Sequence, residues 1–167
     1  MAQEDPVAEP VRIWLGVSHH AAFRVAGWAV VRADEAGVSG FAGGERRLDA
    51  ERGALLALLA ALKDLPAGRS VVLTTSDAIV AGFPARMAAA QAGGEAPADN
   101  LDLWAALSTA LAAREVKIVQ AAAAPGTPPG TPLAFAAAWA EFGRERAKDK
   151  GPFTASIPKP NLAKAGV

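Results

Sequence analysis

Few residues in this sequence have the side-chain types and the spacing of a catalytic or metal-binding site. Glu51 and Asp77 could form a two-carboxylate metal site, provided that a bulge turns Asp77 toward Glu51. The two histidines, His19 and His20, are adjacent, and such a pair can bind a transition metal or respond to pH. The 167 residues include no cysteine, which excludes disulfides, thiolate zinc sites and a cysteine nucleophile.

Each of these residues also has an ordinary structural explanation, and we favour it. A carboxylate near the start of a helix, where Glu51 is expected, is stabilised by the helix dipole and by unpaired N–H groups. Asp77 is expected to cap a second helix. Neighbouring strand residues point to opposite faces, so His19 and His20 are expected to be exposed turn residues rather than ligands of one ion.

Arginines supply one further candidate for a binding site. Arg46, Arg47 and Arg52 form a small basic cluster that could contact phosphate, although Glu45 and Asp49 neutralise part of it. The sequence contains no Walker-type phosphate loop, no zinc-ligand spacing, no nucleophile elbow and no convincing Ser-His-Asp set. The sequence therefore has no motif of this kind that would assign it to an enzyme class.

The composition limits the classes of protein to which the sequence can belong. The length predicts one domain, and 51% hydrophobic with 20% charged residues is typical of a globular chain. Lys+Arg and Asp+Glu both total 17, so the sequence lacks the basic excess that is common in nucleic-acid binders. No apolar run has the length of a membrane helix, and acids replace the positive start of a signal peptide, so we expect a cytoplasmic protein without a membrane partner.

The elements that must position these side chains follow from the apolar pattern. The pattern predicts strands at 11–17, 25–33, 38–42, 71–75 and 116–120, and helices at 49–62, from residue 77, at 100–114 and at 132–148. Three consecutive strands followed by alternating helices and strands predict an α/β fold, with a five-stranded mixed sheet flanked by helices.

The two ends are expected to lie outside this domain, which spans 11–149. Residues 1–10 read as a flexible arm, and 150–167 as a tail in which three prolines prevent regular structure. Three apolar residues of the tail, Phe153, Ile157 and Leu162, could anchor it on a partner protein as a short extended motif.

Four segments of the sequence, in order, resemble the type 1 ribonuclease H family over about residues 11–148. Residues 27–31 (Gly-Trp-Ala-Val-Val) resemble its second strand, and Glu51 with the following apolar helix resembles its first helix. Residues 72–77 (Val-Leu-Thr-Thr-Ser-Asp) resemble its fourth strand. The most specific match is 100–104, Asn-Leu-Asp-Leu-Trp, which combines a cap, an acid and a tryptophan.

The resemblance implies a nuclease site of which most ligands are missing. The family uses four carboxylates to hold two magnesium ions, which activate a water that cuts the RNA strand of an RNA–DNA hybrid. Glu51 matches one of these acids, whereas Gly16, Ser76 and, approximately, Ala138 stand at the other three positions. One carboxylate does not assemble a two-magnesium site, so no cofactor is expected.

The favoured hypothesis is therefore a catalytically inactive ribonuclease H-like domain that binds a protein partner or nucleic acid. The candidate contact residues are His19, His20, Arg46, Arg47, Phe153, Ile157 and Leu162. The alternative is an active, magnesium-dependent nuclease with a remodelled site drawn from Glu51, Asp77, Glu141 and a histidine. A third hypothesis is a different enzyme on the same fold with a small-molecule site, and the oligomeric state stays open.

Overall fold

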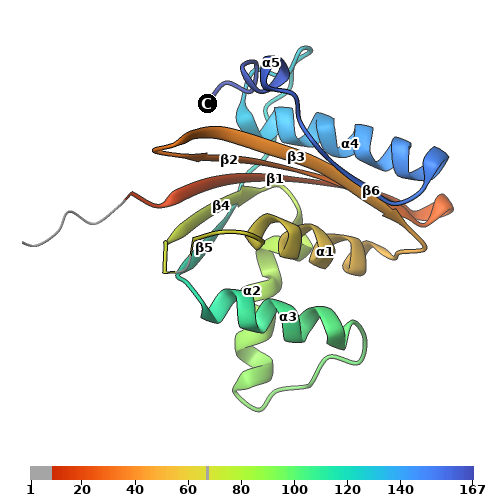
Figure 1. Ribbon diagram of the computed structural model, residues 1–167. Coiled ribbons are helices and arrows are strands. Elements are labelled where there is room, and N and C mark those ends of the chain that lie inside the picture. Colours follow the sequence, from red (N-terminus) through yellow and green to blue (C-terminus); the bar gives the residue numbers. More distant parts are fainter. Residues whose placement is uncertain (1–8, 67) are drawn as a thin grey trace, which may run out of the picture.

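Six strands form one mixed sheet in the order β5-β4-β1-β2-β3-β6 (Figure 1). The computed structural model describes residues 9–66 and 68–167. The strands are β1 (Val11–His20), β2 (Val25–Asp34), β3 (Gly37–Arg46), β4 (Val71–Thr75), β5 (Val116–Gln120) and β6 (Phe153–Ser156). The pairs β1–β2, β2–β3 and β3–β6 are antiparallel, and β1–β4 and β4–β5 are parallel. The predicted mixed sheet flanked by helices is confirmed, with one strand more than expected.

Short polar side chains start three of the helices. The helices are α1 (Ala50–Leu62), α2 (Ala78–Gln91), α3 (Leu101–Ala112), α4 (Pro132–Lys150) and α5 (Lys159–Leu162), with a 3-10 turn at Ala21–Phe23. Asp49, Asp77 and Thr131 each accept a hydrogen bond from a backbone N–H of the first turn that follows. Among the described residues, no helix is long and apolar enough to cross a membrane.

One face of the sheet is covered by α1, with α2 and α3 packed beyond it (Figure 1). The leucine stripe that predicts α1 turns Leu55, Leu58 and Leu62 inward, where they pack with β1 residues such as Ile13 and Leu15. Because these side chains are almost fully removed from water, the hydrophobic effect fixes the face and rotation of α1.

The other face is covered by α4, which lies across β1, β2 and β3 (Figure 1). Glycines at the contact let the helix backbone come close to the strand backbone. A Cβ at Gly44 would lie 2.7 Å from the carbonyl oxygen of Gly143, and a Cβ at Gly143 would lie 2.5 Å from the carbonyl oxygen of Gly43. Real Cβ atoms do not come so close, so these positions accept only glycine without a shift of α4.

The C-terminal segment has regular structure, so the expectation of an irregular tail is wrong. Phe153–Ser156 pair with β3, the strand that would otherwise be the edge of the sheet. Pro152 and Pro158 flank this strand, where a missing N–H breaks no ladder bond. The division into arm, domain and tail stays a prediction, and residues 1–8 of the expected arm lie outside the described residues.

Two apolar residues of this segment are buried against the chain itself. Ile157 is 3% and Leu162 is 8% exposed, and both pack in a cluster with Val31 and Phe135 on the α4 face. Phe153 is half-buried beneath the guanidinium of Arg146. The structure therefore gives the three expected partner anchors an intramolecular role, because their apolar surface is covered by the sheet and α4.

Leu162→Ala tests this packing. We expect a loss of about 2–4 kcal/mol in the free energy of unfolding, because the substitution removes buried methyl groups and leaves a cavity. Leu101→Ala is the matched control, since Leu101 is 60% exposed, and it should cost less than about 0.5 kcal/mol. Urea unfolding followed by circular dichroism measures both, and equal losses would contradict the docking of this segment.

Candidate functional site

Glu51, the one acid that matches the family pattern, is held in a polar network between three helices. It lies in the first turn of α1, and its Oε1 is 2.6 Å from Nη1 of Arg86 on α2. Its Oε2 accepts a hydrogen bond of 3.2 Å from Nδ2 of Asn100, directly before α3. Both carboxylate oxygens thus have partners within the chain, and a cation already neutralises the charge.

Arg52 ties α1 to α3 beside this carboxylate. Its Nη1 and Nη2 donate to the two carboxylate oxygens of Asp102 at 3.1 and 2.9 Å, and Nη1 also donates to Oδ1 of Asn100. This two-point hydrogen bond lowers the pKa of Asp102 and raises the pKa of Arg52. Asn100 or Asp102 was expected to cap α3. Asn100 precedes the helix, but its side chain bonds Glu51 and Arg52 instead of capping, and its backbone is left-handed.

Gly16 stands where the family pattern would have its first aspartate, and the structure leaves no room for a side chain there. Gly16 faces α4, and a Cβ built on it would lie 2.5 Å from the carbonyl carbon of Ala136 and 2.8 Å from the amide nitrogen of Ala137. Both atoms belong to helix backbone, which cannot rotate away as a flexible side chain can. An aspartate would therefore force α4 off the sheet.

The residues at the other acid positions of the family pattern, and Asp77, do not meet Glu51 in one site. Ser76 is exposed after β4, and Ala138 is exposed on the outer side of α4, next to Glu141. Asp77 caps α2, since its Oδ1 accepts a hydrogen bond of 2.9 Å from the Val80 N–H. In the described part of the chain, no three His, Cys, Asp or Glu side chains gather as a possible metal site. These residues do not fit a two-magnesium centre.

The two histidines lie at the end of β1, not in the expected turn. His19 Nε2 is 2.9 Å from the Leu48 carbonyl oxygen, at the start of α1. His20 stacks on Phe23, with ring centroids 4.9 Å apart. The ring of Phe23 in turn lies 4.4 Å from the Nζ of Lys148 on α4. The imidazole of His19 therefore contacts the segment before α1, whereas that of His20 lies toward α4, on the opposite side of the sheet. The two histidines do not form a shared metal site.

The arginines of the expected basic cluster have separate partners. Arg46 Nε donates to the Ala147 carbonyl oxygen of α4 at 2.7 Å, and the same oxygen accepts a hydrogen bond from the Gly151 N–H. Arg52 pairs with Asp102, as described above. Arg47 is exposed, with a left-handed backbone at φ 62°.

Sequence reasoning missed an exposed aromatic ring among cations at one end of the sheet. Phe23 is 58% exposed, in the turn between β1 and β2. Arg24 follows it, and the Leu48 N–H donates to the Arg24 carbonyl oxygen at 2.9 Å, which brings Arg47 alongside. Figure 1 shows the β1–β2 turn beside the C-terminal end of α4. We name His20, Phe23, Arg24, Arg47 and Lys148 the basic end.

Comparison with known proteins connects this architecture to one fold. No family model matches the chain, and no curated protein matches it either. Many solved structures are similar to the chain, including two RNase H structures. LC9-RNase H1, described as a type 1 RNase H with the type 2 active-site motif, has a TM-score of 0.62 at 19% identity, covering 98% of this chain and 84% of that one.

The second is the N-terminal RNase H domain of Rv2228c from Mycobacterium tuberculosis, solved as a fusion with maltose-binding protein. It has a TM-score of 0.56 at 14% identity, covering 84% of this chain and 96% of that one. The chain therefore has the ribonuclease H-like fold, as the sequence resemblance implies.

Gly16→Ala tests the close approach of α4 to β1. We expect it to lower the free energy of unfolding by at least about 2 kcal/mol, because the added methyl group meets helix backbone. Gly82→Ala is the matched control: a Cβ there meets nothing within 4 Å, so it should stabilise α2 by about 0.5–1 kcal/mol. Chemical unfolding of both variants checks this, and a neutral Gly16→Ala would refute the steric argument.

The Arg52–Asp102 pair predicts a pH dependence. Because the pair lowers the pKa of Asp102 in the folded state, its contribution is present above the ordinary pKa and is lost as pH falls through the lowered value. Asp102→Asn should therefore have a lower melting temperature than the wild type at neutral pH, and the difference should shrink below about pH 4. Thermal unfolding from pH 2 to 7 measures this, and a constant difference would contradict the assignment.

Proposed function

We propose that this chain is a catalytically inactive ribonuclease H-like domain that acts by binding. The observation that carries the proposal is the backbone contact at Gly16, where a metal-binding carboxylate would collide with α4. A two-metal site needs several acids that converge on ions about 4 Å apart. Without a carboxylate at Gly16 on β1, the chain lacks one of the acids that a two-metal site needs.

The environment of Glu51 supports the same conclusion. Its ion pair with Arg86 is partly exposed, with side-chain exposures of 31% and 46%. Such a pair contributes about 0.2–1 kcal/mol to stability. Its larger effect is to place a positive charge beside the carboxylate, which opposes the approach of a divalent cation.

We further propose nucleic acid as the bound partner and the basic end as the contact surface. Phe23 offers an exposed ring on which a base can stack, and such stacking tolerates any base sequence. Lys148, Arg24 and Arg47 can contact phosphates on either side of the ring. The net charge of zero does not oppose this contact, since Arg24, Arg47 and Lys148 are three cations at one end of the sheet. One of them, Lys148, pairs with Glu145 at 3.6 Å.

The first experiment measures cleavage. The purified chain should leave a fluorescent RNA–DNA hybrid intact in Mg²⁺ and in Mn²⁺ at equimolar protein. Calorimetry with either ion should show no tight binding. Metal-dependent cleavage that Glu51→Gln abolishes would overturn the proposal of an inactive domain, and Glu115→Gln, at an exposed position before β5, controls for the loss of a surface acid.

The second experiment measures binding by fluorescence anisotropy with the same hybrid, duplex DNA and single-stranded RNA. Arg24→Gln, Arg47→Gln and Lys148→Gln should each weaken binding and reduce the slope of log K against log salt by about one phosphate contact. Arg12→Gln, at an exposed position on the far end of β1, is the matched control. No binding at low salt would contradict a nucleic-acid partner and favour a protein partner.

A further inference from the structure

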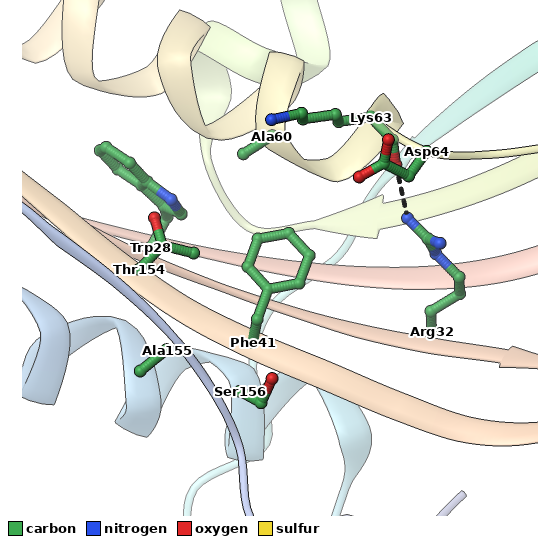
Figure 2. A pocket seen from close by; sticks show the side chains of 9 residues that line it. All are labelled: Trp28, Arg32, Phe41, Ala60, Lys63, Asp64, Thr154, Ala155 and Ser156. Carbon is green, nitrogen blue, oxygen red and sulfur yellow. Dashed lines mark hydrogen bonds between the residues drawn. The ribbon is translucent and has the colours of Figure 1, made fainter.

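A pocket of about 450 Å³ opens on the α1 face of the sheet, between the C-terminal end of α1 and strand β6 (Figure 2). Trp28 and Phe41 project into it from β2 and β3, and Ala60 lines its α1 side. None of its lining residues belongs to the basic end or to the Glu51 network. It is a separate concave site of a volume that small molecules occupy.

Arg32 brings a partly desolvated positive charge to this pocket. Its Nη2 donates to the carbonyl oxygen of Lys63 at 3.0 Å, drawn in Figure 2, and lies 3.4 Å from that of Ala61. Its Nε is buried without a hydrogen-bond partner in the described part of the chain. Burial lowers the pKa of Arg32, and Asp34 and Asp64 offset this only in part. The hydrogen bonds of this cation thus go to neutral carbonyl groups.

A partly buried guanidinium whose hydrogen bonds go to neutral carbonyl groups is stabilised by a bound anion. Removing a charge from water is costly unless it is paired, and two carbonyl oxygens orient the guanidinium without neutralising it. The exposed side chain of Lys63 adds a second positive charge, and Asp64 adds one negative charge. The net charge of +1 among these three residues complements a ligand with a single negative charge.

The rest of the lining complements a flat ring. The half-buried ring of Phe41 and the edge of the Trp28 indole form an apolar floor on the sheet. Thr154 and Ser156 of β6 lie opposite α1, and both are exposed hydroxyl donors and acceptors at the rim. A planar ligand can stack on the floor and still present polar atoms to these hydroxyl groups.

We propose that this pocket binds an aromatic monocarboxylate, with its ring on Phe41, its carboxylate paired with Arg32, and the positive charge of Lys63 adding to the attraction from the α1 side of the pocket. A nucleoside monophosphate also combines a ring with an anion, but it carries close to two negative charges at neutral pH. Asp64 disfavours that second charge. The inference does not depend on the nucleic-acid function proposed above, because the two sites share no residue.

The test uses calorimetric titration of the full chain with 2-naphthoate. We expect saturable binding at a ratio of one to one, and binding at least about tenfold weaker for the uncharged 2-naphthamide. Cyclohexanecarboxylate, which keeps the charge and lacks the planar ring, should also bind more weakly. Adenosine 5′-monophosphate is the competing class, and tighter binding of this nucleotide would overturn the assignment of a monocarboxylate.

Two variants locate the binding. Arg32→Gln should weaken 2-naphthoate binding about tenfold, and Lys63→Gln about threefold, since each removes one positive charge. Lys117→Gln, on the exposed side of β5, is the matched control and should leave the affinity unchanged. Lys63 is exposed, so its variant stays informative if Arg32→Gln unfolds. Equal affinities for the wild type and Lys63→Gln, or no saturation up to roughly 10 mM, would overturn the proposal.

Discussion

The contact between the backbone of α4 and the backbones of β1, β2 and β3 determines much of this molecule. It depends on small residues on both sides, above all Gly16, Gly44 and Gly143. Because the interior of a protein is close-packed, a helix that approaches so closely gains dispersion energy along its whole length. The same approach removes the space that a functional side chain on the central strand would need. The stability of the helix packing and the absence of room for a side chain at Gly16 thus have one geometric cause.

On the other face of the sheet, ion pairs connect the three helices α1, α2 and α3. Carboxylates at the ends of α1 and α3 are matched by guanidinium groups from neighbouring helices, as in Arg52–Asp102 and Arg86–Glu51. Each pair is partly exposed and individually weak. Together they orient α1, α2 and α3 through charge, while the leucines of α1 supply most of the binding energy between the layers.

Sequence patterns predicted five of the strands, the four long helices and the cap at Asp77, because periodic burial and capping are local properties. The placement of Gly16 and Ser76 at acid positions rests on the family resemblance and stays a prediction. The sequence patterns did not predict β6, because Phe153–Ser156 becomes a strand only through pairing with β3 more than a hundred residues earlier. The sequence indicated His20 and Arg47 of the basic end but not Phe23 or Lys148, because these two residues meet only in the folded chain.

The pairing of β6 with β3 has a consequence for biosynthesis. The antiparallel strands β1, β2 and β3 leave the ribosome first, and the strand that covers the open edge of β3 follows only after α4. Until then, β3 presents unpaired N–H and C=O groups to the surrounding solution. Contacts between segments so distant in sequence form slowly. The nascent chain therefore passes through a period in which that edge can pair with another polypeptide, and completion of the C-terminal strand ends it.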